Sequence, residues 1–335
     1  MRKSCLVTKN ISLFTIKTFM PTELESPKPT EWQTPPPLVI IVIFIAIFMY
    51  SFAAIFIKLS EQDVGPNATV FNRFWIATIC LGFWRWMEVL RLRLSFDEMA
   101  SSKNYTTKEL GLLLLGATLA ELSQLAWAWS LTETGVANAN LLHNFTPVFT
   151  AFGGWLLLGH YFGLRFVFGL TLAIVGAITI GLEDWQVGTD NLVGDSLALL
   201  SAFFYAMSVL VIEQLRTKFS ATGILLWSCL LRSCLTFPLV LLAEDRLFPS
   251  SLQGWLAVIS LAVLCQVLAS MILVHQLKTY SSGFISLFLL LEPIFTAILG
   301  WIIFGEQLSF LNWLAFLVVL LGIYLAQSNQ GPKKS

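Results

Sequence analysis

A succession of apolar runs, each about 20 residues long, fills this chain from Leu38 almost to its end. The hydrocarbon core of a bilayer is about 30 Å thick, and a helix needs roughly 20 apolar residues to cross it. Backbone groups in hydrocarbon must bond within their own segment, so each run is expected to be helical. We therefore predict an all-α membrane protein with about ten transmembrane helices, at residues 38–58, 67–87, 110–131, 137–158, 163–182, 193–213, 222–243, 254–276, 283–303 and 309–327.

The composition supports a membrane protein and argues against a nucleic-acid partner. Apolar residues make up 56% of the 335 residues and charged residues only 12%, whereas soluble domains are roughly 25% charged. The formal net charge is zero, so no basic surface for nucleic acid is expected. The lipid bilayer is the expected surrounding.

The two ends of the chain differ from the apolar runs. Residues 1–37 hold several prolines and scattered charges, which predicts a disordered cytoplasmic tail, and residues 328–335 are expected to be a cytoplasmic C-terminal tail. The first twenty residues lack acids and faintly resemble an organellar transit peptide. A cytoplasmic tail is the favoured interpretation.

The distribution of positive charge predicts the orientation. If both termini are cytoplasmic, most of the 20 Lys and Arg residues fall on the inside, and the connection at 183–195, which is rich in acids, falls outside. The positive-inside rule therefore favours an even number of spans. We expect an integral protein of a bacterial inner membrane, with an organellar membrane as the less favoured alternative.

Two stretches in the expected fourth and ninth spans are copies of each other. Residues Pro147 to His160 and Pro293 to Glu306 are identical at seven of fourteen positions without a gap. The spans therefore divide into two five-helix repeats, 38–182 and 193–327. Because five is odd, the second repeat enters the membrane from the opposite side. Such inverted repeats are widespread in secondary transporters, whose substrate sites lie near the midplane.

These paired Pro…Gly stretches, with an arginine in the second and seventh spans, resemble the drug/metabolite transporter superfamily, specifically its members with two EamA domains. The resemblance covers about residues 38–327. It implies ten helices, cytoplasmic termini and transport of metabolites such as amino acids, nucleotides or amphipathic compounds. The chain departs from the family pattern at His160, where glutamate is usual, and at Tyr50 and Tyr205, where tryptophan is common.

Two carboxyl groups are expected near the middle of the membrane, where ionisable groups are costly and tend to be functional. Glu292 precedes Pro293, which predicts a kinked helix facing a wet cavity; the alternative is an acid that locks helices together. Glu121 shares a helix face with Gln124. The pair could contact a substrate or proton, or Glu121 could form a structural ion pair with one of the two arginines.

The densest polar stretch of any span lies next to Pro147, the other expected helix break. It includes Asn140, His143 and Asn144. We interpret these residues as cavity lining, with hydrogen bonding between helices as the alternative. Aromatic candidates for the cavity wall are Tyr50, Tyr205 and Trp127, although each could equally pack against lipid.

Arg73 and Arg232 occupy matching places in the second and seventh spans. Each lies about two turns from the nearer end of its span. Snorkelling of the side chain toward the headgroups is the favoured interpretation. An internal ion pair or contact with an anion is the alternative.

The sequence as a whole predicts a secondary transporter that exports or exchanges a small metabolite by alternating access. No Gly-x-x-x-x-Gly-Lys-[Ser/Thr] loop for ATP occurs, so a proton or cation gradient, or exchange, is expected to supply the energy. An intramembrane enzyme and a channel are the alternatives. His-Glu-x-x-His and Gly-x-Ser-x-Gly motifs are absent. We expect no catalytic residues, no cofactor and no bound metal, and a monomer or homodimer.

Overall fold

The computed structural model describes residues 36–94, 106–133, 139, 142–182, 192–304 and 310–327. Within these ranges the regular structure is helical and contains no strand. The expected tails fall outside the described residues, except for Pro36 and Pro37, and Pro37 already begins the first helix. The helices are α2 (Pro37–Ser51), α3 (Ala53–Ser60), α4 (Pro66–Leu94), α5 (Thr107–Glu133), α7 (Thr146–Leu158), α8 (Leu164–Leu182), α9 (Leu192–Arg216), α10 (Ala221–Ala243), α11 (Leu252–Ser260), the π-helix η1 (Leu261–Ala269), α12 (Ser270–Gln276), α13 (Ser282–Leu289), α14 (Glu292–Phe304) and α15 (Phe310–Gln327).

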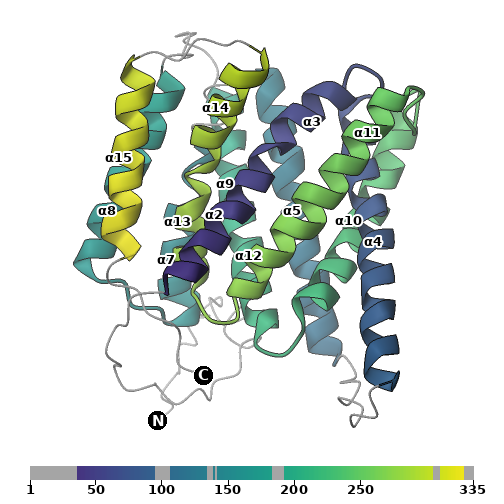
Figure 1. Ribbon diagram of the computed structural model, residues 1–335, viewed down its shortest axis with the longest axis horizontal. Coiled ribbons are helices and arrows are strands. Elements are labelled where there is room, and N and C mark those ends of the chain that lie inside the picture. Colours follow the sequence, from purple (N-terminus) through teal and green to yellow (C-terminus); the bar gives the residue numbers. More distant parts are fainter. Residues whose placement is uncertain are drawn as a thin grey trace, which may run out of the picture. The chain divides into compact units, whose positions relative to one another are not determined.

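These elements pass ten times from one end of the helical bundle to the other, because several passes are built from consecutive helices: α2 with α3, α11 with η1 and α12, and α13 with α14. Helix α2 begins and helix α15 ends at the lower end in Figure 1, which we call the terminal end. The opposite end carries the turn at residues 61–65, and we call it the turn end. The prediction of an all-α membrane protein with ten spans is confirmed.

Length and composition support membrane crossing for most of these passes. Six helical stretches are long and apolar enough to span a bilayer, and three shorter apolar helices accompany them. Helix α4 has 29 residues, but polar side chains such as Asn72 and Arg73 lower its hydropathy. Large apolar side chains are exposed on the outside of the bundle, for example Leu164 (89%), Leu242 (86%) and Phe310 (85%). Such a surface suits lipid rather than water.

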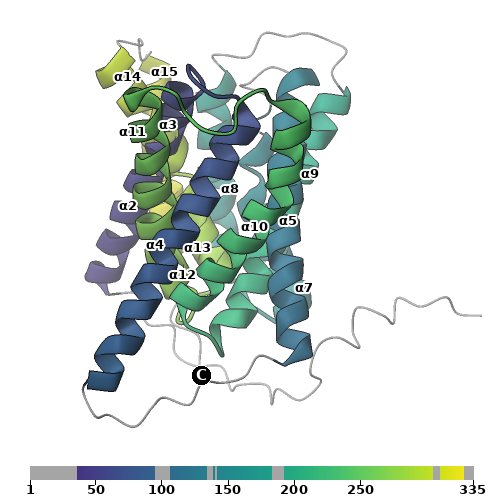
Figure 2. The same ribbon diagram turned by 90° about the vertical axis from the view of Figure 1, so that its right-hand side faces the viewer.

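The two repeats are visible in the packing. Helix α4 packs against α10, and α8 packs against α15, so a helix from the first repeat meets its own copy in the second. Figure 1 shows both pairs, and Figure 2 shows α4 beside α10. Helix α2 runs from the terminal end to the turn end, and its counterpart α9 runs the other way. The inverted arrangement expected from five spans per repeat is therefore confirmed.

Glycines allow α8 and α15 to approach closely. A Cβ atom added to Gly169 would lie 2.5 Å from the backbone oxygen of Gly322, and one added to Gly322 would lie 2.4 Å from the backbone nitrogen of Ala173. Small residues at such contacts are the usual basis of helix association in membranes.

The expected breaks at Pro147 and Pro293 occur at matching positions. Helix α7 starts at Thr146 and α14 at Glu292, so both prolines lie in a first helical turn, where a missing N–H costs nothing. Just before each start, the chain makes a tight i→i−3 bond: Phe145 N donates to Leu142 O (3.1 Å), and Leu291 N donates to Phe288 O (3.0 Å). Both spans are thus interrupted helices.

Candidate functional site

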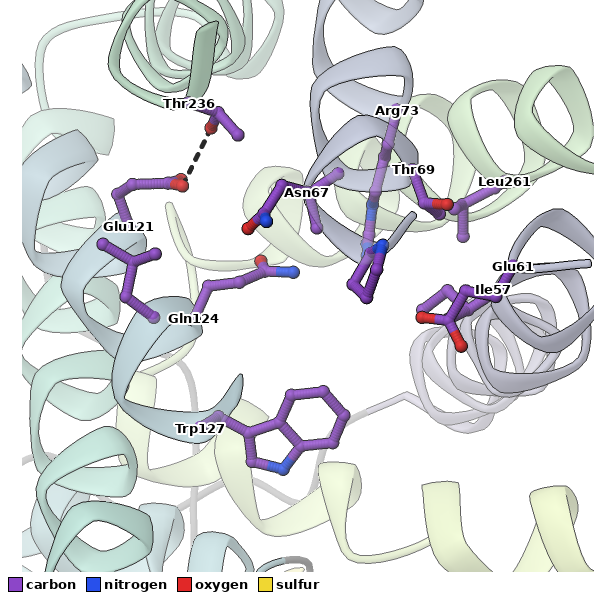
Figure 3. A pocket seen from close by; sticks show the side chains of 13 residues that line it. Ile57, Glu61, Asn67, Thr69, Arg73, Glu121, Gln124, Trp127, Thr236 and Leu261 are labelled. Atoms are coloured by element: carbon purple, nitrogen blue, oxygen red, sulfur yellow. Dashed lines mark hydrogen bonds between the residues drawn. The ribbon is translucent and has the colours of Figure 1, made fainter. Parts of the chain in front are cut away.

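A cavity of about 60 Å³ lies within the bundle between α3, α4, α5, α10 and η1. Figure 3 shows Glu121, Gln124 and Trp127 of α5 on one side, facing Arg73 and Thr69 of α4. The lining continues to Glu61 and Pro66, which are exposed at the turn end. The cavity therefore connects the middle of the bundle with the turn end.

One of the two arginines is neutralised by a carboxylate. Arg232 Nε donates to Glu121 Oε2 (3.0 Å), and its Nη2 donates to Gln124 Oε1 (2.7 Å). The other carboxylate oxygen, Glu121 Oε1, accepts a bond from the Thr236 hydroxyl (2.9 Å), drawn as a dashed line in Figure 3. Side-chain exposure is only 12% for Arg232 and 5% for Glu121. Of the two alternatives for Glu121, the geometry matches the structural ion pair.

The other arginine has neutral hydrogen-bond partners. Arg73 Nε donates to Gln266 Oε1 (3.0 Å), and its Nη2 donates to the hydroxyl of Tyr50 (3.3 Å). The Gln266 amide in turn contacts Cys229 Sγ at 3.7 Å, which directs its oxygen toward Arg73. Within the described part of the chain, no carboxylate oxygen lies within 4.0 Å of the Arg73 guanidinium.

The prediction that both arginines snorkel toward the headgroups is wrong. Arg73 is 7% exposed, and the two guanidinium carbons lie 5.8 Å (Arg73) and 3.9 Å (Arg232) from the centre of the buried Phe74 ring. The side chains turn inward because hydrogen-bonding partners on α5 and η1 are available there. Both arginines therefore belong to one polar layer inside the bundle.

The terminal end is held together by one bond between the two repeats and one within the second repeat. Glu213 of α9 pairs through Oε1 with His160 Nε2 (3.0 Å) and accepts through Oε2 from the backbone nitrogen of Ser282 (2.7 Å). His160 reaches this position because Gly159 has a φ of 68°, a left-handed conformation that suits glycine, and ends α7 there. Contacts from α7, α9 and α13 thus meet in one place.

At the turn end, outside the spans, two acidic side chains are perturbed by their neighbours. The Asp63 carboxylate accepts bonds from the hydroxyl and backbone N–H groups of Ser250 and Ser251. These donors, led by the Ser250 hydroxyl, lower the pKa of Asp63 to about 2. At the cavity mouth, burial raises the pKa of Glu61, and the nearby Glu244 carboxylate raises it further.

Glu292 lies deep in the bundle but outside the lining of the cavity. Its backbone oxygen accepts a bond from the Ser51 hydroxyl (3.4 Å). Its carboxylate interacts electrostatically with Arg73, and Tyr205 interacts with both groups. Glu292, Tyr205, Tyr50 and the two arginines therefore form one electrostatic cluster.

The described polar residues beside Pro147, His143 and Asn144, do not line this cavity. Asn140 lies outside the described residues. His143 Nδ1 lies 3.1 Å from the Ser201 hydroxyl, and its ring centre lies 5.8 Å from that of Tyr205. Asn144 is half-buried at the helix break. The described histidine geometry fits hydrogen bonding between helices, the alternative interpretation.

Sequence reasoning missed Gln266, although a signal for it exists. Residues Leu119-Ala-Glu-Leu-Ser-Gln124 of α5 correspond to Leu261-Ala-Val-Leu-Cys-Gln266 of η1. Each glutamine accepts a hydrogen bond from the arginine of the other repeat: Gln124 from Arg232, and Gln266 from Arg73. The match shows that the Arg–Gln pair is duplicated, whereas valine occupies the position of Glu121 in the second copy.

Among the described residues, no group of three or more His, Cys, Asp or Glu side chains is placed to share a metal ion. The arrangement instead offers a polar layer that could bind a small molecule by hydrogen bonds and charge, with Trp127 as an aromatic wall.

Comparison with known proteins identifies the family. The model of the EamA-like transporter family matches twice, at residues 37–182 and 192–327. An uncharacterized transporter of Archaeoglobus fulgidus is 23% identical over 297 residues, covering 87% of this chain and 97% of that protein. A crystal structure with 16% sequence identity has a TM-score of 0.72 and covers 86% of this chain and 96% of its own, which shows a shared fold. The chain therefore belongs to the EamA-like transporter family.

Proposed function

We propose that this protein is a secondary transporter that moves a small metabolite across a membrane by alternating access. The observation that carries the proposal is the unequal state of the two ends. The cavity reaches exposed residues at the turn end, while Glu213 joins α7–α8 and α13 at the terminal end. Inverted repeats can exchange their conformations, and that exchange would close one end and open the other.

The helix breaks are the natural hinges for this exchange. Because α7 and α14 start at equivalent positions, each half-helix can turn about its break without disturbing an intact α-helical ladder. Motion of α7 and α14 in opposite senses would interchange the two ends.

The orientation follows from the charge distribution. We place the terminal end in the cytoplasm of a bacterial inner membrane, in line with the positive-inside rule. The cavity then faces outward in the state described. An export or exchange cycle requires the same layer to become accessible from the cytoplasm.

Glu292 is our candidate for coupling to a proton or cation. Proteoliposomes containing the full chain should accumulate or release substrate in response to a pH or sodium gradient. Glu292→Gln should abolish the response to the gradient while exchange of substrate for substrate continues. Gradient-driven transport that is unchanged in Glu292→Gln would remove Glu292 from the mechanism.

Exchange kinetics separate a carrier from the alternative of a channel. A carrier loaded inside with unlabelled substrate takes up labelled substrate faster, since return of the loaded protein is faster than return of the empty one. A channel shows no such stimulation. Uptake that is independent of internal substrate, with flux that does not saturate, would overturn the transporter proposal.

A further inference from the structure

We propose that His160 makes closure of the terminal end depend on pH: the protonated imidazole holds this end closed through Glu213, and the neutral imidazole lets it open. This proposal rests on the proposed transport function, because it assumes that the terminal end opens during the cycle. It goes beyond that function by naming the side chain that responds to protons and the direction of the response.

The first step is the contact that the imidazole makes. His160 Nε2 lies 3.0 Å from Glu213 Oε1, and Ser282 N donates to the other carboxylate oxygen (2.7 Å). The exposed fractions of the two side chains are 15% for His160 and 3% for Glu213, so water screens their interaction only weakly. Protonation of the ring adds the attraction between opposite charges to the hydrogen bond and so strengthens the contact.

The second step is the placement of the ring. His160 N donates to Gly154 O (3.0 Å) at the end of α7, and a Cβ atom added to Gly154 would lie 2.7 Å from His160 Nδ1. The ring therefore lies directly against α7. A movement of α7 away from α9 carries the ring away from Glu213, so the contact exists only while the terminal end is closed. Because the proton strengthens a contact that the open state lacks, a lower pH shifts the equilibrium toward the closed state.

The third step is the identity of the group that titrates. Histidine ordinarily changes its charge near pH 6.5. Side chains of the other ionisable types around this contact ordinarily titrate below about pH 5 or above about pH 9. In the described part of the chain, they are Tyr161 and Arg165 beside His160, Glu213 and Arg216 on α9, and Lys278 and Tyr280 before α13.

Protons from the terminal side can reach the ring. The adjacent Tyr161 is 78% exposed, so water contacts the connection that carries His160. Arg216, the nearest cation on α9 in sequence, is engaged elsewhere, because its guanidinium donates to the backbone oxygens of Phe219 and Val274. Protonation of His160 therefore supplies a positive charge beside Glu213 that varies with the pH of the terminal side.

Histidine is not a requirement of the repeated fold. The second repeat has Glu306 after Gly305, where the first has His160 after Gly159. The two copies of this stretch thus accept side chains of different charge. A side chain that titrates near neutral pH, placed against a carboxylate in only one copy, points to control of one end.

The test measures a distance across the terminal end, using the full chain in nanodiscs, where both faces share one pH. Spin labels are attached to cysteines introduced at Leu164 and Thr217, after the native cysteines are replaced. Both sites are exposed, one at the start of α8 and the other just after α9. Electron spin resonance should show mainly a short distance at low pH. The ratio of long to short distances should rise roughly 10-fold between pH 5.5 and pH 8, below the limit of 10-fold per pH unit for one proton.

Substitutions separate the charge of the side chain from its bulk. His160→Gln can still donate to Glu213 but does not titrate, so the ratio should lose its dependence on pH. His160→Lys is charged throughout this range, so the terminal end should stay closed at every pH. The matched control is His275→Gln, because His275 is an exposed histidine in the last turn of α12, and its pH profile should equal that of the labelled chain without it. Melting transitions establish that each variant is folded.

Three outcomes would overturn the proposal: the distances do not depend on pH, the long distance grows as the pH falls, or His160→Gln keeps the full dependence. Loss of the dependence in His275→Gln would also overturn it, by assigning the response to His275.

The transport proposal fails separately. Gln62 and Phe310 are the counterparts of Thr217 and Leu164 in the other repeat and are exposed at the turn end. Labels at these two sites should move closer together as the terminal end opens. If the terminal distance responds to pH while the turn-end distance stays constant, the switch at His160 stands and alternating access is contradicted.

Discussion

The pair of Arg232 and Glu121 contributes to stability because both side chains are shielded from water. Their exposed fractions are 12% and 5%. Glu121→Gln should lower the free energy of unfolding by about 3–5 kcal/mol, since it leaves a buried charge without its counter-ion. Reversible unfolding in mixed micelles measures the change.

A matched control for this variant is Glu88→Gln. The ion pair between Arg85 and Glu88 lies on the surface of α4, with exposed fractions of 47% and 35%. Exposed pairs contribute about 0–1 kcal/mol. If Glu121→Gln and Glu88→Gln lowered the free energy of unfolding equally, burial would not be the reason why Glu121 matters.

Because the pKa of Asp63 is lowered in the folded chain, we expect the stability of the protein to depend on pH. Its bonds to Ser250 and Ser251 lower its pKa from 3.8 to about 2. A lowered pKa in the folded state stabilises the fold above the ordinary pKa, and this contribution is lost as the pH falls through the folded-state value. Asp63→Asn should therefore lower the melting temperature at pH 7, and the difference from the native chain should shrink between pH 3.8 and pH 2.

Asp245→Asn is the control for Asp63, because Asp245 is an exposed aspartate in the same connection that supplies Ser250 and Ser251. Its melting curve should follow that of the native chain at every pH. A difference between Asp63→Asn and the native chain that persists unchanged at pH 2 would contradict the assigned cause.

The inward orientation of the two arginine side chains could not be predicted from the sequence. Their depth in the spans was readable from the sequence, but depth alone fits both snorkelling and an inward orientation. The rotation of α4 and α10 about their axes decides between the two. That rotation depends on which helices pack on each side, and those contacts are far apart in the sequence.

At the scale of helices, the contact between α8 and α15 depends on glycine. Gly322→Ala should lower the free energy of unfolding by about 1–3 kcal/mol, the usual cost of overpacking, because its Cβ would lie 2.4 Å from Ala173 N. Gly111→Ala in α5 is the matched control, since nothing lies within 4 Å of its Cβ. It should be neutral or stabilising by up to about 1 kcal/mol through helix propensity. If the two variants changed the free energy of unfolding in the same direction, close packing at Gly322 would not be the cause.

Apolar length and proline position predicted most elements, but two features escaped. The first span is interrupted at Phe52, between α2 and α3, and the eighth span contains η1. Neither has a proline or glycine to signal it. A π-helix forms where side-chain packing favours a shifted hydrogen-bond ladder, often at functional sites, and η1 supplies the Gln266 that holds Arg73.

For the whole molecule, the contact at Glu213 should control which end is open. Glu213→Ala removes both the His160 pair and the acceptor for Ser282 N. We expect a cysteine introduced at the buried Ser286 to react faster with an impermeant thiol reagent from the terminal side. A cysteine at Thr69, in the cavity, should react more slowly from the turn side. The native cysteines are replaced beforehand in both cases.

Glu88→Gln serves as the comparison for this accessibility experiment as well, because its ion pair with Arg85 stays within α4 and a glutamine can still accept the bond from Thr222 of α10. Its labelling pattern should equal that of the native chain. If Glu213→Ala changes neither rate, or changes both in the same direction, the two ends are not coupled as proposed.

The duplicated Arg–Gln pair also has an evolutionary consequence. After a gene doubles, one copy can preserve an inherited role while the other is released to change. Here one copy pairs Glu121 with Arg232, whereas the other has Val263 at the equivalent position and holds Arg73 with the neutral partners Gln266 and Tyr50. The side chains around Arg232 are therefore constrained by an ion pair, whereas those around Arg73 are not, so relatives should differ more around Arg73 than around Arg232.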